Sequence, residues 1–206
     1  MATQDETTRV LVINGSYRDD GVIDRVIDLA VNALDRGGAD VECVQLRHYP
    51  IEFCLNCRAC TQQPGEAPGE CVHHDGMAEL VARIERADAY VLAAPTNFGS
   101  VTAVFKRFME RLVVYAYWPD GQPYPRYRKA NAPRKKALLV SSSGAPGLLG
   151  RWMFQSVSQL KMAAKVIGAE PVGSVFTGAI VDDLEHRIPA GIEKRTRSLA
   201  GKLLRG

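Results

Sequence analysis

Short apolar runs, rich in β-branched residues, alternate with segments of helical periodicity along almost the whole chain. The runs lie at 10–13, 41–46, 89–94, 137–140 and 170–177. Between them, apolar residues recur every three or four positions, as Met77, Leu80 and Ile84 do, which is the spacing of one helix face. Five strands alternating with five helices predict an α/β protein, in which helices cover both faces of an open parallel sheet.

The length of 206 residues suits one such domain, and we expect it to span 1–206. Two segments depart from the alternation. A loop at 47–74 contains four of the five cysteines, and an excursion at 115–133 is rich in proline and aromatic residues, so we expect it to be irregular. Cys43 stands alone within an apolar run, and we expect it in the core.

Composition excludes several classes of protein. Hydrophobic residues make up 46% and charged residues 24%, as in ordinary globular domains. A net charge of +3 is too weak to indicate nucleic-acid binding. The apolar run at 112–118 is far shorter than the roughly 20 residues of a membrane helix, so no membrane insertion is expected. The first ten residues are polar and acidic, which predicts no secretory signal and a cytoplasmic location.

Ligands of open parallel sheets bind beyond the carboxyl ends of the strands, where strand order reverses. The loop after the first strand, 14–21, leads directly into a helix, so its backbone N–H groups and the helix dipole suit a phosphate. Ser16 adds a hydroxyl and Arg18 a permanent positive charge. An ordinary strand-to-helix turn is the alternative. The glycine pattern of dinucleotide-binding loops and the Gly-Lys-Ser/Thr of a Walker A loop are both absent.

Two further loops at the same edge suit a planar ring. The loop at 94–100 combines an aromatic residue, amide and hydroxyl groups and a glycine, and the loop at 141–147 consists of small residues that allow close approach. Small polar residues are common in loops, so neither is specific alone. Together with the first loop they predict a mononucleotide site, with phosphate on the first loop and the ring between the other two.

Three segments carry a resemblance to a known family: NGSYR before a helix, APTNFGSVTAVFKRFMERL, and SSSGAPG. They resemble the flavodoxin-like NAD(P)H-dependent FMN reductase and quinone reductase superfamily. The cysteine segment CLNCRAC…PGECVHHDGM resembles its iron–sulfur flavoprotein branch. The resemblance covers roughly 10–177. It implies a flavodoxin-like five-stranded sheet with strand order 2-1-3-4-5, an FMN cofactor and NAD(P)H as co-substrate.

The resemblance also implies which residues bind FMN. The phosphate is expected on Ser16, Arg18 and the backbone of Gly21, Val22 and Ile23. The isoalloxazine ring is expected against Pro95, Thr96, Asn97, Phe98 and Gly99, and against Ser141, Ser142, Ser143 and Gly144. The chain departs from the pattern at Val22 and Ile23, where iron–sulfur flavoproteins usually have a polar pair. Phosphate binding is therefore expected to depend on backbone donors, Ser16 and Arg18.

Cys54, Cys57, Cys60 and Cys71 supply four thiols, the number that a [4Fe–4S] cluster requires. Three of them follow a compact Cys-x2-Cys-x2-Cys spacing, and ten residues separate Cys60 from Cys71, a longer spacer than is common in the family. Four thiolates suit a tetrahedral zinc ion equally well. Free thiols that line the flavin pocket are the third interpretation, and the spacing does not decide among them.

Two histidines follow Cys71. A metal-binding histidine pair is normally four residues apart on one helix face, whereas neighbouring histidines on a loop point apart. We therefore expect His73 and His74 to be exposed polar residues, and Asp75 to cap the next helix.

The resemblance implies an FMN-dependent NAD(P)H oxidoreductase that reduces a quinone, a flavin, a nitroaromatic or a similar small acceptor. With flavin chemistry no catalytic side chain is required. A flavodoxin-like electron carrier and a thiol-based redox sensor are the alternatives. The family also implies a homodimer or homotetramer, with the aromatic residues of 115–133 as one candidate contact.

Overall fold

The structure is a computed structural model that describes residues 7–145, 153–178 and 188–204. Its centre is a five-stranded parallel sheet with the order β2-β1-β3-β8-β9. The strands are β1 (Arg9–Asn14), β2 (Asp40–Gln45), β3 (Ala89–Ala93), β8 (Lys135–Ser142) and β9 (Ala169–Thr177). This is the predicted order 2-1-3-4-5, so the predicted flavodoxin-like fold is confirmed.

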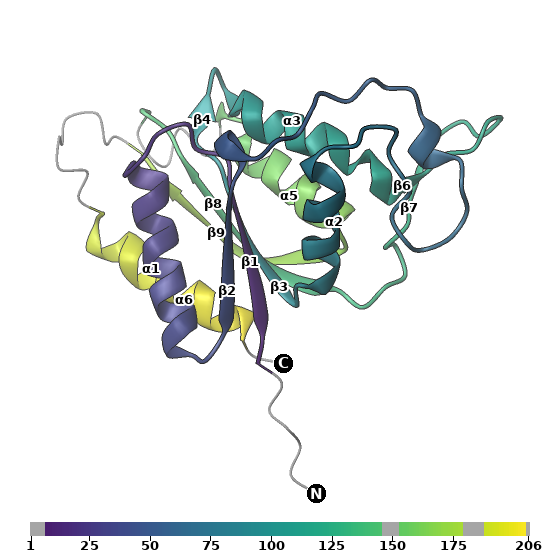
Figure 1. Ribbon diagram of the computed structural model, residues 1–206. Coiled ribbons are helices and arrows are strands. Elements are labelled where there is room, and N and C mark those ends of the chain that lie inside the picture. The colour runs from purple at the N-terminus through teal and green to yellow at the C-terminus, as the bar shows by residue number, and fades with distance from the viewer. Residues whose placement is uncertain (1–6, 146–152, 179–187, 205–206) are drawn as a thin grey trace, which may run out of the picture.

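Helices cover both faces of the sheet (Figure 1). On one face lie α1 (Val22–Arg36) and α6 (Ala190–Leu203). The other face is covered by α2 (Gly76–Arg86), α3 (Ala103–Arg111) and α5 (Ser156–Val166). Val101 and Met153 have the apolar spacing of the helices that follow them in sequence, yet α3 and α5 begin after these residues. Thr102 caps α3 by accepting a hydrogen bond from the N–H of Phe105, so Val101 precedes the helix, and Met153 lies outside α5.

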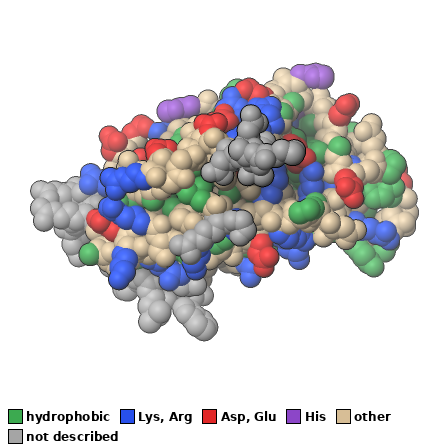
Figure 2. All heavy atoms as spheres, turned by 90° about the horizontal axis from the view of Figure 1, so that it is seen from below, with side chains coloured by type: hydrophobic (Ala, Val, Ile, Leu, Met, Phe, Trp, Pro, Cys, Tyr) green, Lys and Arg blue, Asp and Glu red, His purple; other side chains and the backbone are tan. Residues whose placement is uncertain are grey.

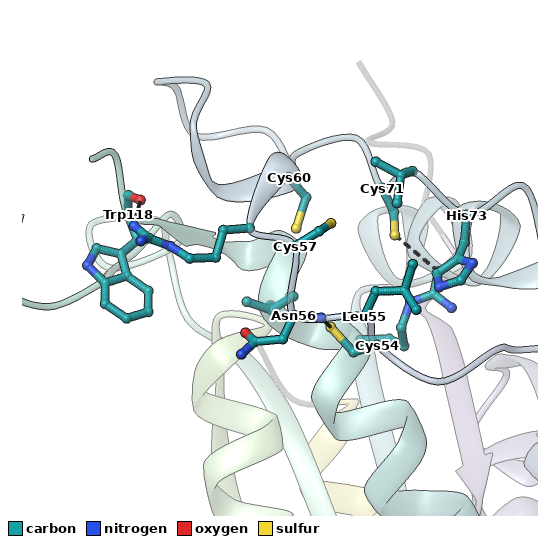
Figure 3. Close-up of a pocket in the computed structure, with 12 residues that line it drawn as sticks. Cys54, Leu55, Asn56, Cys57, Cys60, Cys71, His73 and Trp118 are labelled. Atoms are coloured by element: carbon teal, nitrogen blue, oxygen red, sulfur yellow. Dashed lines mark hydrogen bonds between the residues drawn. The ribbon is translucent and has the colours of Figure 1, made fainter. Parts of the chain in front are cut away.

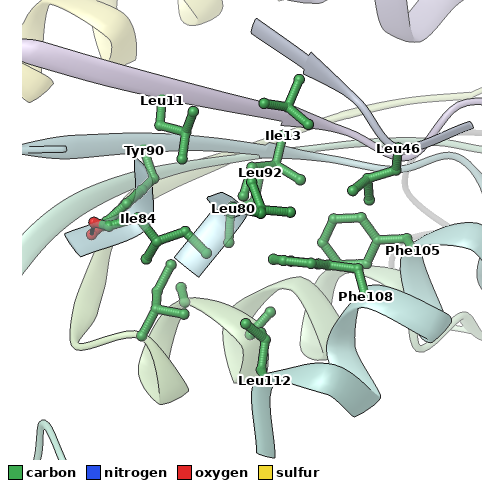
Figure 4. Packing of buried hydrophobic residues seen from close by; sticks show 14 of the residues in the cluster. Leu11, Ile13, Leu46, Leu80, Ile84, Tyr90, Leu92, Phe105, Phe108 and Leu112 are labelled. Carbon is green, nitrogen blue, oxygen red and sulfur yellow. Dashed lines mark hydrogen bonds between the residues drawn. The ribbon is translucent and has the colours of Figure 1, made fainter. Parts of the chain in front are cut away.

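The core is split by the sheet into two layers. Side chains alternate along β1, so Val10 and Val12 face α1 and α6 while Leu11 and Ile13 face α2 and α3. The layer between the sheet and helices α2, α3 and α5 contains the larger side chains (Figure 4). There Phe105 and Phe108 of α3 meet edge to face, with ring centroids 5.6 Å apart.

Two short ribbons lie outside the main sheet. The loop after β3 forms a hairpin of β4 (Thr96–Asn97) and β5 (Ser100–Val101). Within the excursion 115–133, β6 (Ala116–Tyr117) pairs with β7 (Arg126–Tyr127), so the prediction of an irregular segment is wrong there. Two-residue strands are too short to show the alternation that identifies a strand in sequence.

Cys43 is exposed, which contradicts its predicted place in the core. It lies on β2, which is at the edge of the sheet, and only Val44 in this strand is buried. An apolar run on an edge strand is therefore not evidence that each of its residues is covered.

The cysteine loop packs against the excursion (Figure 1). Its 3-10 turn η2 (Ala59–Thr61) lies beside η3 (Leu112–Tyr115) and β6. The N–H of Trp118 donates to Thr61 O at 2.8 Å, and the N–H of Gly69 donates to Val114 O at 2.8 Å. Among the described residues, no helix is both long enough and apolar enough to cross a membrane.

Candidate functional site

The three predicted loops lie side by side at the carboxyl edge of the sheet. The N–H of Gly15 donates to Ala93 O at 2.8 Å, and the N–H of Ala94 donates to Val140 O at 3.0 Å. These bonds connect the ends of β1, β3 and β8 directly. The juxtaposition follows from the strand order, because β1, β3 and β8 are neighbours in the sheet.

The first loop is held in place by its own side chains. Asn14 Oδ1 accepts the N–H of Ser16 at 2.8 Å, and Ser16 Oγ lies 3.2 Å from the N–H of Arg18. Two residues at the N-terminus of α3 also hold this loop. Thr102 Oγ1 donates to Gly15 O at 2.6 Å, and the N–H of Val104 donates to the Tyr17 hydroxyl at 3.0 Å. Ser16 is buried, and the Arg18 side chain is exposed.

A carboxylate lies where this loop meets α1. Asp24, in the first turn, accepts the N–H of Gly21 at 3.0 Å through Oδ2 and the side-chain amide of Asn14 at 2.6 Å through Oδ1. Ile23 packs into the core, and Val22 is half-buried. The side chains of Val22 and Ile23 therefore offer no donor to an anion.

Arg47 reaches the first loop from the segment after β2. Its Nη1 donates to Ser16 O at 3.3 Å and to Arg18 O at 3.1 Å, and its Nη2 pairs with Asp19. A second cation therefore stands beside the loop, and its charge is shared with a carboxylate and two carbonyls.

The second loop presents an aromatic ring at its tip. Phe98 is fully exposed, and its φ of 50° and the φ of 80° at Gly99 are left-handed values that favour glycine at the second position. Asn97 is exposed beside Phe98, and Gly99 O accepts the N–H of Gln155 at 2.9 Å. The hairpin thus holds Phe98 away from the core by backbone geometry.

Ser156 of α5 links the second and third loops. Its Oγ lies 2.8 Å from Thr96 Oγ1 and 3.0 Å from Ser141 Oγ. Ser141 and Ser142 are the last residues of β8 rather than loop residues, and both are buried. The loop continues with the half-buried Ser143, and its predicted residues 146–147 lie outside the described residues.

The four clustered cysteines line one cavity of about 40 Å³, together with Arg111 and Trp118 (Figure 3). Cys60 is buried, Cys57 is exposed, and Cys54 and Cys71 are half-buried. Burial raises the pKa of Cys60, and its electrostatic interactions with Cys71, Cys54 and Cys57 raise it further. Within the described residues, no three His, Cys, Asp or Glu side chains are arranged to hold a metal ion. The sulfurs are thus not in ligating positions in this structure, but four thiols on one cavity are the number and kind of ligand that a [4Fe–4S] cluster or a zinc ion takes.

Arg111 connects this cavity to α2. The side chain is 1% exposed, and its Nη1 donates to Asp75 Oδ2 at 2.6 Å. Its Nη2 donates to Asp75 Oδ1 at 3.1 Å and to Cys71 Sγ at 3.4 Å. Asp75 also accepts the N–H of Met77, so the predicted N-cap of α2 is confirmed. Burial alone would raise the pKa of Asp75, but hydrogen bonds from Arg111 and from the N–H groups of Glu52 and Met77 lower it to about 2.

Arg128, which follows β7, holds the spacer between Cys60 and Cys71. Its guanidinium donates to Cys60 O at 3.1 Å, to Gly65 O at 2.9 Å and to Val114 O at 3.1 Å. Gly69 packs so closely against this turn that a Cβ there would lie 1.8 Å from Cys60 O. The ten-residue spacer is therefore folded tightly onto the protein.

Of the two histidines after Cys71, His73 lines the same cavity as the four cysteines. His74 is exposed, as predicted. His73 is half-buried, and its Nε2 lies 3.0 Å from Phe53 O, so the prediction that it is exposed is wrong.

A family model described as NADPH-dependent FMN reductase matches residues 8–177. The chain belongs to this family. Its relatives include an iron-sulfur flavoprotein of Archaeoglobus fulgidus, 36% identical over 107 residues, which are 52% of this chain and 46% of that protein. An iron-sulfur flavoprotein of Methanocaldococcus jannaschii is 29% identical over 103 residues, 50% of this chain and 51% of that protein. This chain thus matches about half the length of these curated relatives.

Solved structures share the FMN reductase fold. The NAD(P)H:quinone oxidoreductase of Methanothermobacter marburgensis aligns with a TM-score of 0.69 over 96% of this chain and 98% of that one, at 16% identity. An FMN-dependent NADH-azoreductase of Bacillus anthracis, in complex with FMN, aligns with a TM-score of 0.67 over 97% of this chain and all of that one, at 14% identity. At such identities the likeness concerns the fold alone.

In this member of the FMN reductase family, most of the residues predicted to bind FMN lie at the carboxyl edge of the sheet. Other residues that were not predicted lie beside them. Ser141 is buried, and its hydroxyl is bonded to Ser156 inside the protein. Asp24, Arg47 and Ser156 were not predicted to belong to the site. Asp24 had a visible signal, since an acidic residue in the first helical turn commonly accepts N–H groups there.

Proposed function

We propose that this chain is an FMN-dependent NAD(P)H oxidoreductase that reduces a small acceptor such as a quinone, a flavin or a nitroaromatic. The observation that carries the proposal is the meeting of the three loops at the switch point of the sheet, as the bonds from Gly15 to Ala93 and from Ala94 to Val140 show. Membership of the FMN reductase family supports it.

Each loop has a separate task in this proposal. Ser16, Arg18 and the N–H groups of 21–23 bind the phosphate, with the N–H of Gly21 shared with the Asp24 carboxylate, while 95–99 and 141–144 bind the ring. When bound, FMN supplies a ring that accepts hydride from NAD(P)H and delivers electrons to the acceptor. The chain orients the reactants: the hairpin presents the exposed Phe98 ring, and the bonds of Ser156 keep the hairpin at a fixed distance from β8.

Steady-state oxidation of NADH and NADPH with menadione as acceptor tests the activity. Turnover that depends on bound FMN is the expected result. A protein that binds FMN but shows no turnover with any acceptor would instead be an electron carrier. A conformational change on oxidation without turnover would favour a thiol-based sensor.

We also propose that the four clustered cysteines hold a [4Fe–4S] cluster. Their four thiols line a single cavity, and curated relatives carry the name iron-sulfur flavoprotein. The guanidinium of Arg111 donates to one of the four sulfurs, and hydrogen bonds of this kind are among the features that set the reduction potential of such clusters.

Iron analysis and absorbance after anaerobic purification test the cluster. Four irons per chain are expected, and Cys57→Ser should lose iron and the broad iron–sulfur absorbance while FMN stays bound. Cys43→Ser is the matched control, because Cys43 is an exposed cysteine outside the cavity. Less than about one iron per chain would refute the cluster; stoichiometric zinc would show a zinc site, and the absence of both metals would leave free thiols.

The predicted homodimer or homotetramer and the predicted cytoplasmic location stay predictions. Light scattering across a wide concentration range tests the first, and a mass of one chain throughout would contradict it.

A further inference from the structure

A carboxylate of α1 is already bonded to the loop proposed to bind the FMN phosphate. The carboxylate of Asp24 accepts the N–H of Gly21 at 3.0 Å and the side-chain amide of Asn14 at 2.6 Å. Gly21 is the N-cap of α1, where free N–H groups and the helix dipole attract negative charge. Two donors at the phosphate end of the site are thus occupied by a side chain of the same helix.

The cations near the Asp24 carboxylate do not cancel its negative charge. The segment 19–28 contains four acids, Asp19, Asp20, Asp24 and Asp28. The nearby cations are Arg18, Arg25 and Arg47. Arg47 is paired with Asp19 and with two backbone carbonyls of the loop. Burial raises the pKa of Asp28, and the negative charges of Asp24 and Asp20 raise it further, so the acids of this segment act on one another.

No hydroxyl compensates for the occupied donors. Val22 and Ile23 stand at the first two positions of α1, and neither side chain can donate a hydrogen bond. A phosphate at this loop would therefore depend on the remaining N–H groups, Ser16 and Arg18, with the Asp24 carboxylate beside it. Like charges held close together in a partly desolvated site repel each other.

We propose that Asp24 is a specificity-determining residue that works against the phosphate of FMN. The proposal rests on the flavin site proposed above. Its consequence concerns the tail of the flavin: the carboxylate weakens binding of a flavin that ends in a phosphate and leaves one that ends in a hydroxyl unaffected. The chain therefore discriminates less between FMN and riboflavin than the same loop would without the charge of Asp24.

Fluorescence titration of the flavin-free protein with FMN and with riboflavin tests this. Asp24→Asn keeps an oxygen that can accept the N–H of Gly21 and removes the negative charge. The expected result is a dissociation constant for FMN at least ten-fold lower than in the wild type, with that for riboflavin changed less than two-fold. Asp24→Ser, which also keeps an acceptor without the charge, should change the two constants in the same directions, and it replaces the amide variant if that one does not fold.

Asp20→Asn is the matched control. Asp20 is an exposed acid of the same loop at φ 55°, a left-handed conformation that Asn tolerates well. It should change FMN affinity less than three-fold, because it removes one charge that is not directed at the loop donors.

Two results would overturn the inference. One is an unchanged ratio of FMN to riboflavin affinity in both Asp24 variants, whether or not both affinities rise in parallel. The other is an equal gain in FMN affinity in Asp20→Asn. Failure of the proposed function looks different: neither flavin would then bind the wild type or the Asp24 variants, and the inference would fall with it.

Discussion

Replacing Arg111 by Met breaks the most deeply buried ion pair described in the protein. The side chains of Arg111 and Asp75 are 1% and 10% exposed, and two hydrogen bonds of 2.6 Å and 3.1 Å join them. Methionine fills most of the space but leaves the Asp75 carboxylate buried without its cation. Removing one partner of such a pair costs about 3–5 kcal/mol of unfolding free energy. Because small domains have about 5–15 kcal/mol in total, this loss is a large fraction of the stability of the protein.

Urea denaturation at matched flavin content measures this loss, since bound ligand adds to apparent stability. Lys106→Met is the control on the same helix. Lys106 is about half exposed and pairs with Glu110 at 3.6 Å, four residues away, so its removal should cost less than about 0.5 kcal/mol.

The pH dependence of the loss identifies its cause. The pKa of Asp75 in the folded protein is about 2, below the value of roughly 3.9 in an unfolded chain. A depressed folded pKa gives stability that is complete above the unfolded pKa and is lost as pH falls toward the folded one. The difference between wild type and Arg111→Met should therefore be largest near pH 7 and narrow between about pH 5 and pH 2. A loss under about 1 kcal/mol at pH 7, or one that does not change with pH, would refute the reasoning.

Two further substitutions test the loops. Arg18→Ala should weaken FMN binding by about 1.5–3 kcal/mol, the range for a hydrogen bond to a charged group, and Ser16→Ala by less; equal affinity of wild type and Arg18→Ala in fluorescence titration would remove the first loop from the site. Gly69→Ala should destabilise the protein by about 1–3 kcal/mol, since its Cβ would lie 1.8 Å from Cys60 O, whereas Gly201→Ala, with open space around it, should not destabilise it in the same thermal melt.

The architecture was predictable because the central strands β1, β3 and β8 are buried on both faces and each helix is buried on one. The first type of burial requires continuous apolar runs, and the second requires a 3.6-residue period, so both are visible in the sequence. The strand order came from the family resemblance, and with it the juxtaposition of the loops after β1, β3 and β8.

The side chains that organise the site were harder to predict, because their roles depend on contacts across the chain. Ser156 acts through hydroxyls 15 and 60 residues away. Arg128 belongs to a basic segment that is typical of a solvated surface, yet it is buried by the cysteine loop. Arg111 had a signal that could have been used, because it follows Phe108 by three residues and so continues the apolar face of its helix.

The absence of nucleic-acid binding stays a prediction, and the distribution of charge agrees with it. On the face seen in Figure 2, acidic side chains lie between the basic ones. A continuous basic stripe would be the expected footprint of a nucleic-acid partner.

The bonds from Arg128 to the cysteine loop have a consequence for the order in which the protein matures. Arg128 and Cys60 are 68 residues apart, and Arg111 and Cys71 are 40 apart. During synthesis at about 5–20 residues per second, the thiols therefore leave the ribosome several seconds before the arginines that fix them. In that interval the four cysteines belong to an unconstrained segment that is open to oxidation or to a stray metal ion. The contacts that hold the spacer and Cys71 form only after the segment around 111–128 has been synthesised.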